Sequence, residues 1–450
     1  MDVTNTTRAW HTQTAGHVTV VVDGKDQTSR GSRHTPRRQK QPEDEIPGIP
    51  DWPWRWGGHG NVLNDGRLRL YNTDFDMVQV ADADAERAYG SLVDLEVYRR
   101  TVALIKISDT DVYVVDLFRV KGGKTHDYML HGCLEEPHRA AFSLPVETER
   151  DGTLHKYIGD LKTARTDSPW DVTFTLDDGS AALKTFFLPQ PGTEIICGEA
   201  PAMRRNGTAP FVAVRQSDGE SLFAAVHHPY KDTPLVRKVE LVPLDSSHDG
   251  AIAIRVSLPD RTDTIVATTG ENDGSVRTQD GQIELRGRFA HIAEGGENWA
   301  YLIDGDRLVA PEREITGRTS HTGVIHKTHR VEAGDATDAF VTQADLPVDG
   351  SLDGRTLMLD EGGLLVQAFR VRAVESRNSE TLIHSHDEPG MSVTPGLIKL
   401  EYFPNWGIKG EARFRIAGAA LLRADRSGRW TFAASGDVSA AVRGKTVERE

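Results

Sequence analysis

Cysteine is nearly absent from this sequence: Cys133 and Cys197 are the two that occur among 450 residues. Two cysteines exclude a disulfide framework and a cysteine-based zinc motif, and they allow one disulfide bond at most. Hydrophobic residues make up 38% of the chain, and the 42 glycines bring the apolar share into the range of globular proteins. The fold therefore has to be stabilised by burial of apolar surface.

Long apolar runs are missing too. No stretch approaches the roughly 18 residues of a membrane helix, and Met1 to Thr7 lack the charged-then-apolar layout of a secretory signal. Positive charge is also in deficit, since 53 Lys and Arg stand against 67 Asp and Glu, for a net charge of −14. That balance disfavours a protein that coats nucleic acid or an anionic membrane. We expect no membrane span and no nucleic-acid partner.

Period-two alternation of β-branched and aromatic residues is the main pattern that is present, and it is typical of half-buried strands. The pair Asp-Gly, which suits hairpin turns, occurs eleven times. No stretch of twelve or more residues has helical periodicity. We predict an all-β protein with a large antiparallel β-sandwich, a super-sandwich, over residues 1–335 and a smaller C-terminal β-sandwich over residues 336–450.

Residues 28–69 interrupt this pattern with a basic run followed by a Pro- and Trp-rich stretch, so we expect a long loop there. Its candidate substrate-binding residues are Trp52, Trp54, Arg55 and Trp56. Exposed indoles stack on sugar rings, and a guanidinium binds carboxylates or sulfates. The same tryptophans could instead cover a sheet edge.

The candidate catalytic residues are two histidines and a tyrosine in one short segment. The segment from Gly122 to Gly132 contains His126, Tyr128 and His131, which offer side chains for acid and base chemistry. Alternatively, these side chains satisfy buried backbone groups. His17 is a candidate metal ligand, or else a hydrogen-bonded sheet histidine.

Two further histidine pairs differ in their spacing. His384 and His386 share one face of an expected strand, at a separation that suits one zinc ion if a third ligand exists. His227 and His228 are adjacent, so their rings lie on opposite faces and joint ligation is not expected.

Several segments together resemble the heparinase II/III-like polysaccharide lyases. The first runs His17-Val-Thr-Val-Val-Val-Asp-Gly-Lys-Asp-Gln27. Further matching segments follow in the family's order along the chain: Tyr98-Arg-Arg-Thr-Val-Ala-Leu-Ile105, Val115-Asp-Leu-Phe-Arg-Val-Lys-Gly-Gly123, His126-Asp-Tyr128, His131-Gly132, His228-Pro-Tyr-Lys231, Asp387-Glu-Pro-Gly390 and Tyr402-Phe-Pro404.

The resemblance implies enzymes in which an α/α toroid precedes β-sandwiches and in which uronic-acid polysaccharides are cleaved by β-elimination. It also implies a zinc ligand at His17, although Val18 stands where the family has Asn. The other implied ligands and the catalytic toroid would precede this segment, and no helical toroid is found in the sequence. Action on extracellular glycans implies a periplasmic or extracellular location.

Three functional hypotheses follow, and one of them is an independent metal enzyme centred on His384 and His386. In the first, the chain is the β-sandwich part of such a lyase, a truncated or split product that is a poor catalyst alone. An acidic polysaccharide is then its substrate, and a toroid on a missing or neighbouring polypeptide is its partner. In the second, the chain is a non-catalytic carbohydrate-binding or scaffold protein.

Overall fold

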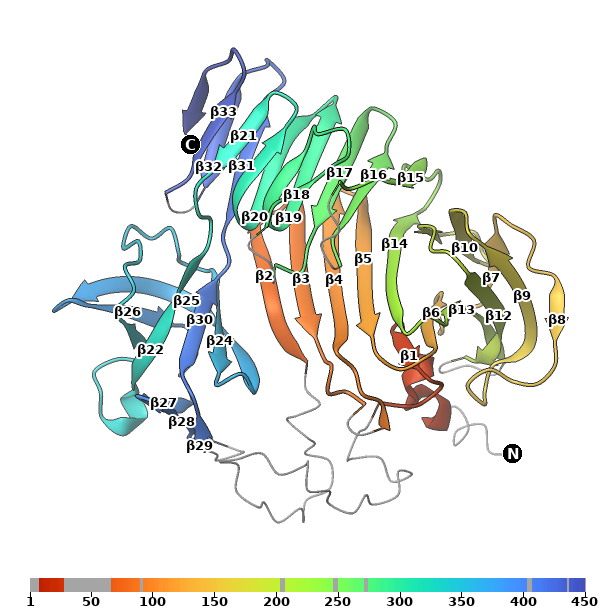
Figure 1. The fold of residues 1–450 in the computed structure, drawn as a ribbon, viewed down its shortest axis with the longest axis horizontal. Helices are drawn as coiled ribbons and strands as arrows, with labels where there is room; N and C mark the ends of the chain where they lie inside the picture. The colour runs from red at the N-terminus through yellow and green to blue at the C-terminus, as the bar shows by residue number, and fades with distance from the viewer. Residues whose placement is uncertain are drawn as a thin grey trace. The chain divides into compact units, whose positions relative to one another are not determined.

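The computed structural model describes residues 8–27, 66–89, 92–202, 207–245, 250–270, 274–402, 407–434 and 437–449. Strands dominate these residues, and the pairings are nearly all antiparallel (Figure 1). Helical structure in the described part is confined to short segments such as the 3₁₀ turns η1 (Thr14–Gly16) and η4 (Val331–Ala333). The all-β prediction is confirmed.

The chain forms two compact units. Unit 1 comprises Met1–Thr28, Asp76–Val242 and Ile254–Asp263, and unit 2 comprises Ser29–Phe75, Pro243–Ala253 and Thr264–Glu450. The expected domain boundary at residues 335/336 lies within unit 2, just after η4. Strand β2 (Arg67–Phe75) begins inside the segment expected to be a loop, so residues 67–69 are strand.

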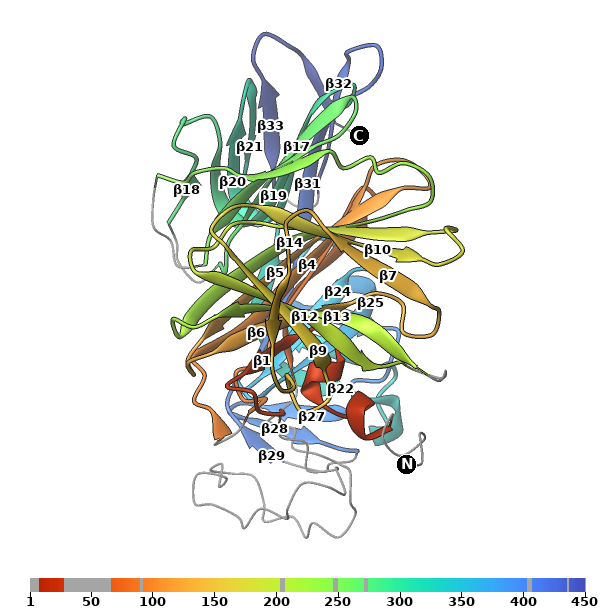
Figure 2. The ribbon, with the colours of Figure 1, turned by 90° about the vertical axis from the view of Figure 1, so that its right-hand side faces the viewer.

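Unit 1 is a β-sandwich. One sheet has the strand order β1 (Val20–Val22), β6 (His126–His131), β13 (Thr208–Gln216), β12 (Thr193–Pro201), β9 (Gly159–Thr166) and β8 (Thr148–Arg150). Facing it are β3 (Val78–Asp84), β4 (Val97–Lys106), β5 (Val112–Lys121), β14 (Glu220–Tyr230), β11 (Ala182–Phe187), β10 (Trp170–Leu176) and β7 (His138–Phe142). Figure 2 shows both sets of strands from the side.

The core between these two sheets is built by the period-two alternation that the sequence displays. Val20, Tyr128 and Val212 come from the first sheet, and they pack in one cluster with Phe118 and Phe223 of the second. A second apolar cluster lies on the opposite face of the first sheet, where Met129 and Phe211 pack with Trp10 from the N-terminal segment. The first sheet is therefore covered on both faces.

Unit 2 contains a sheet and a barrel. Strand β15 (Lys238–Leu241) belongs to unit 1, and the next two strands, β16 (Ile252–Ser257) and β17 (Arg261–Ala267), each have residues in both units. The sheet runs β19 (Glu284–Gly295), β20 (Asn298–Ala310), β31 (Ala419–Ala424), β32 (Trp430–Ala434) and β34 (Val447–Arg449), with β18 (Val276–Arg277), β21 (Arg313–Thr316) and β33 (Ser439–Val442) beside this path.

The barrel of unit 2 is closed by six strands in the order β22 (His321–His329), β23 (Ala339–Thr342), β26 (Glu380–Ser385), β25 (Leu365–Arg377), β24 (Thr356–Glu361) and β30 (Ala412–Ile416). A three-stranded sheet of β27 (Met391–Thr394), β28 (Leu397–Leu400) and β29 (Gly407–Lys409) packs against it, because its apolar side chains join the barrel core. We call this three-stranded sheet the end sheet.

Candidate functional site

Strand β1 brings the N-terminal motif against the motif that follows β5. Val20, Val21 and Val22 pair with Tyr128, Asp127 and His126 of β6. Asp23 has a left-handed backbone (φ 51°), and its carboxylate accepts the N–H groups of Lys124 and Thr125 at 2.8 and 2.9 Å. The Asp-Gly turn after β1 thus binds the Gly-Gly turn before β6, which is a structural role.

Two tyrosines fix β1 from the other side. The hydroxyls of Tyr89 and Tyr98 both donate to the Val20 carbonyl, at 3.0 and 2.6 Å. Gln27 donates its side-chain amide to the Tyr98 hydroxyl at 3.0 Å. The motif residues from His17 to Gln27 are therefore bound to the segment that begins at Tyr98.

A buried ionic network links the two sheets of unit 1 around Asp116, whose side chain is 1% exposed. Arg100 donates Nε and Nη2 to the two carboxylate oxygens at 2.9 and 2.7 Å, and the Tyr128 hydroxyl donates to Oδ2 at 2.5 Å. The Nε2 atom of His227 lies 3.4 Å from the same oxygen, and its Nδ1 lies 2.9 Å from the Thr185 hydroxyl.

The network determines the protonation states of its members. Burial alone would raise the pKa of Asp116, but hydrogen bonds from His227 and Arg100 hold that pKa well below its usual range. Burial raises the pKa of Tyr128 well above its usual range, and the negative charge of Asp116 raises it further. Asp116 is therefore ionised and Tyr128 is a hydrogen-bond donor at neutral pH.

Strand alternation separates the three catalytic candidates. His126 and Tyr128 point into the sandwich core, and both are 0% exposed. His126 has its Nδ1 2.7 Å from the Ser221 hydroxyl and its Nε2 2.8 Å from the Gly122 carbonyl, and burial lowers its pKa. His131 lies on the opposite face of β6 with Asp127 and Met129, where it is half-buried.

His131 has the geometry of a neutral base. Its Nδ1 lies 2.8 Å from the Gly132 carbonyl oxygen, so Nδ1 carries the proton and Nε2 keeps its lone pair. Burial lowers the pKa of His131, and positive charge on His17, His138 or His11 would lower it further. The imidazole is therefore neutral at pH 7.

The residues whose charges act on His131 form what we call the histidine cluster: His11, His17, His131 and His138. The Phe211 ring contacts both His131 and Trp10, with centroids 4.8 and 5.3 Å apart, and this contact brings the N-terminal segment beside β6.

His138 packs directly on Gly132, where a Cβ atom would lie 2.6 Å from the His138 Nε2. Glycine is required there by this close approach. The buried Nε2 of His138 and both ring nitrogens of His11 have no hydrogen-bond partner among the described residues.

His17 is exposed, and its neighbours do not complete a metal site. Across the described ranges, no group of three or more His, Cys, Asp or Glu side chains is placed to hold a metal ion. His384 is buried near Thr337 and Glu375, whereas His386 is exposed. The described residues thus do not fit a zinc site, and zinc at His17 stays an implication of the resemblance.

The other sequence-derived candidates have different outcomes. Trp52, Trp54, Arg55 and Trp56 lie outside the described residues. His227 and His228 do have separate environments: His227 joins the Asp116 network, whereas the Nε2 of His228 accepts the N–H of Leu235 at 2.9 Å.

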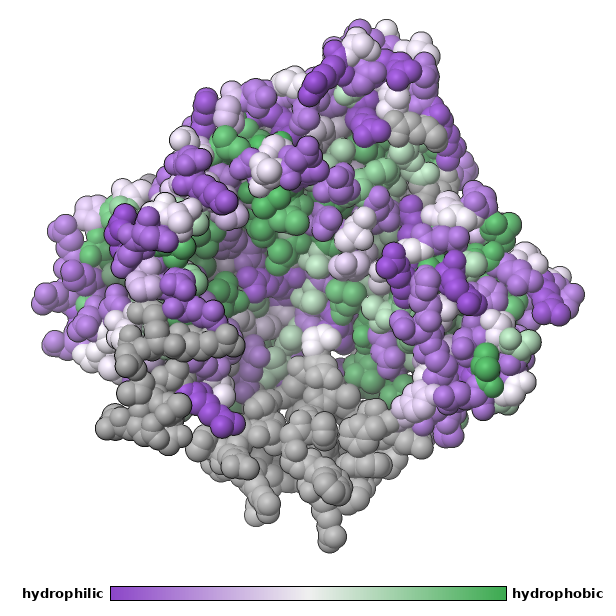
Figure 3. All heavy atoms as spheres, turned by 180° about the vertical axis from the view of Figure 1, so that it is seen from behind, coloured by the Kyte–Doolittle hydropathy of each residue, from purple (hydrophilic) through white to green (hydrophobic). Residues whose placement is uncertain are grey.

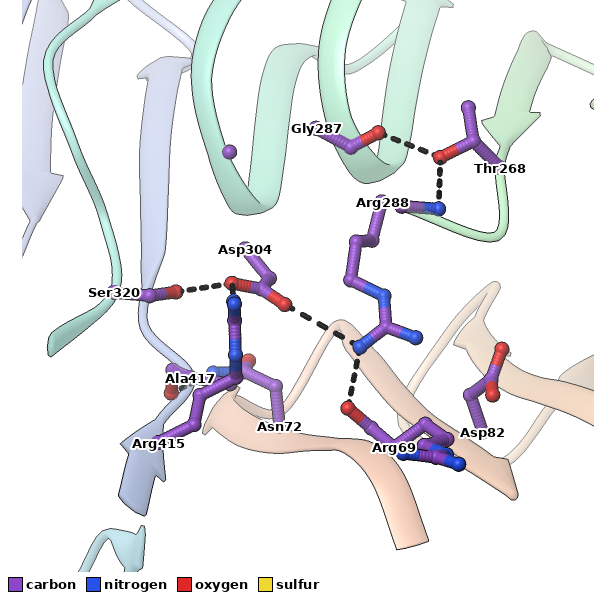
Figure 4. A network of polar contacts seen from close by, with 12 residues as sticks. Arg69, Asn72, Asp82, Thr268, Gly287, Arg288, Asp304, Ser320, Arg415 and Ala417 are labelled. Atoms are coloured by element: carbon purple, nitrogen blue, oxygen red, sulfur yellow. Dashed lines mark hydrogen bonds and ion pairs between the residues drawn. The ribbon is translucent and has the colours of Figure 1, made fainter. Parts of the chain in front are cut away.

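A second buried carboxylate with several partners occurs in unit 2. Asp304 accepts the Ser320 hydroxyl at 2.5 Å and an N–H of Arg415, and its other oxygen is 3.6 Å from Arg288 (Figure 4). Arg288 also donates to the Arg69 carbonyl. This network is structural.

The face of the molecule in Figure 3 is mainly hydrophilic, with scattered apolar patches.

Sequence reasoning missed three of the residues that define these sites. His11 gave no signal, because it lies in the six described residues that precede the 3₁₀ turn and belongs to no motif. Arg100 and Asp116 did give one, since an Arg and an Asp inside apolar strand segments must be paired when buried.

Comparisons with known proteins add little beyond this geometry. No protein-family model matches the sequence, and no curated protein matches it. The crystal structure of heparinase III is similar over 57% of this chain and 30% of that chain, with 9% sequence identity and a TM-score of 0.32.

No helix in the described residues is long and apolar enough to cross a membrane.

Proposed function

We propose that this chain is the β-sandwich part of a heparinase II/III-like polysaccharide lyase that acts on uronic-acid-containing polysaccharides by β-elimination. The observation that carries the proposal is the neutral imidazole of His131, whose Nε2 keeps its lone pair within the histidine cluster. A neutral imidazole is an effective proton acceptor near pH 7. The ordered resemblance of the motifs is the second support.

In this proposal His131 removes the C5 proton of the uronate. That proton becomes acidic when the neighbouring carboxylate is neutralised, so preorganised donors are needed beside the base. His17 is the candidate donor, because it is exposed, whereas the Nε2 atom of His138 and the ring nitrogens of His11 are buried. A role of His126 and Tyr128 in proton transfer would require them to be exposed, because both are buried and hydrogen-bonded here.

The acid that protonates the leaving oxygen would come from a helical toroid supplied by another polypeptide or by a longer form of this protein. Tryptophans 52, 54 and 56, with Arg55, would bind the sugar chain. We propose a periplasmic or extracellular location, and we expect the 450-residue chain to be a weak catalyst alone.

A non-catalytic glycan-binding protein is the alternative. It is favoured by one specific observation: two of the three catalytic candidates, His126 and Tyr128, are 0% exposed and have internal partners. In this alternative the tryptophans bind a glycan without turnover.

The test is to incubate the purified chain with several uronic-acid polysaccharides and to follow ultraviolet absorbance of unsaturated uronate products. Turnover that falls at least about a hundredfold in His131→Ala supports the lyase proposal. His326→Ala, a partly exposed histidine of unit 2 paired with Glu380, is the matched control and should keep activity. Turnover unchanged in His131→Ala would remove the assignment of the base.

Binding separates the two proposals. Affinity without turnover, lost in Trp54→Ala, supports the glycan-binding alternative. No affinity for any uronic-acid polysaccharide contradicts both.

A further inference from the structure

Glu361 is a buried carboxylate inside the barrel of unit 2. It ends β24, and by strand alternation it shares a face with Leu357 and Leu359, both of which belong to the barrel core. Its residue exposure is 0%. The side chain therefore points into an apolar interior.

Among the described residues, no side chain compensates the charge of Glu361. Leu365 of β25 and Ala412 of β30 are its strand partners. Both carboxylate oxygens are buried, and neither has a hydrogen-bond partner among the described residues. An ionised carboxylate without a partner is far less stable in such a place than in water.

The charged groups on the elements around Glu361 have other partners or are exposed. Arg67 of β2 donates to the Gly363 carbonyl at 3.2 Å. On β24, Asp360 accepts the N–H of Gly363 at 2.6 Å. Glu411, directly before β30, binds Arg413 of β30 at 2.9 Å. Lys399 of β28 binds Glu401 at 2.9 Å. Lys409 at the end of β29 is exposed, and no charged side chain of β25 opposes Glu361.

The end sheet covers this end of the barrel. Its buried side chains pack in the same cluster as Leu357 and Leu359: Met391, Val393, Ile398, Leu400 and Ile408. The turn directly after Glu361 touches β29, since a Cβ on Gly362 would lie 2.9 Å from the Lys409 carbonyl oxygen and 3.0 Å from Ile408. Water can reach Glu361 from this side only if the contact between the Gly362 turn and β29 opens.

We propose that Glu361 is a proton-sensitive switch: it stays inside the barrel when protonated, and its ionisation opens the contact between the end sheet and the barrel. Burial raises the pKa of Glu361 to about 7, and the negative charge of Asp360 acts in the same direction. The closed form thus binds the proton more tightly than an open, hydrated form does. A rise in pH through neutrality favours opening.

Hydrogen exchange tests this proposal on the full chain. After correction for intrinsic exchange rates, local opening of residues 391–400 and 407–409 should increase about ten- to a hundredfold between pH 5 and pH 8. In Glu361→Gln, which cannot ionise, opening of the same residues should be independent of pH. Asp360→Asn is the matched control, and it should keep the pH dependence.

An unchanged pH dependence in Glu361→Gln would overturn the proposal. If that variant folds poorly, Glu361→Leu replaces the carboxyl group with an apolar side chain of similar size, and its opening must also be independent of pH. The measurement uses no polysaccharide, so its outcome does not depend on the proposed function.

Discussion

Asp116 of unit 1 and Glu361 of unit 2 are both buried carboxylates, but their surroundings differ completely. Asp116 has Arg100, Tyr128 and His227 as partners, and its pKa is lowered. Glu361 has no hydrogen-bond partner in the described part of the chain, and its pKa is raised to about 7. The partners of a carboxylate, and not its depth, thus decide whether it is charged at neutral pH.

The largest effect is expected from Arg100→Met, which removes the main partner of Asp116. The uncompensated charge of Asp116 should lower the free energy of unfolding by about 3–5 kcal/mol. Urea denaturation at pH 7 measures this loss. Arg372→Met, a change at an exposed arginine of β25, is the control and should alter the free energy by less than about 0.5 kcal/mol. Equal losses in the two variants would contradict the comparison.

Opposite pH dependences provide the second test. The pKa of Asp116 is lowered on folding, so its stabilisation is present above about pH 4 and is lost as the pH falls below that value. The pKa of Glu361 is raised, so stability is highest below about pH 4.5 and is lost as the pH rises through about 7.

Glu361→Gln should therefore stabilise the protein by up to about 3 kcal/mol at pH 8, since each pKa unit corresponds to about 1.4 kcal/mol. At pH 4 it should have almost no effect. Urea denaturation across this pH range measures the free energy of unfolding as a function of pH. Asp116→Asn should weaken its fall at acid pH and leave its fall near pH 7 unchanged. A gain in Glu361→Gln that is the same at pH 4 and pH 8 would be inconsistent with titration of this group.

A smaller effect is expected from Tyr128→Phe. The change removes the hydroxyl that donates to Asp116 at 2.5 Å, while Arg100 still binds both carboxylate oxygens. The free energy of unfolding should fall by about 1–2 kcal/mol. The double variant with Arg100→Met should lose less than the sum of the two single losses, because the residues share one network. Strict additivity would mean that the two partners act independently.

The smallest effect concerns Asp23, a carboxylate at the edge of unit 1. Asn also accepts N–H groups and tolerates a left-handed backbone, so Asp23→Asn should lower the free energy of unfolding by about 0.5–1 kcal/mol. Asp23→Ala loses both acceptors and should cost more. Thermal unfolding of the two variants measures the difference, and equal midpoints would show that the hydrogen bonds to Lys124 and Thr125 contribute nothing.

Alternation along the sequence was sufficient to predict the all-β class, since a one-face burial pattern is local information. It also implies that His126 and Tyr128 share a face and that His131 lies on the other. It does not reveal which face is the core, because this depends on the distant strands that pair with β6. The interior position of Glu361 could not be predicted for the same reason. The segment Asp360-Glu-Gly-Gly363 resembles an exposed turn, and Glu361 is interior because the distant strands of the barrel close around it.

The pairing of β1 with β6 also has a consequence in time. Val20 pairs with Tyr128, so β1 lacks its sheet partner β6 until more than a hundred further residues are made. At about 5–20 residues per second, this delay is about 5–20 seconds of synthesis. During that interval the run Val20-Val21-Val22 remains a β-forming segment without its sheet partner.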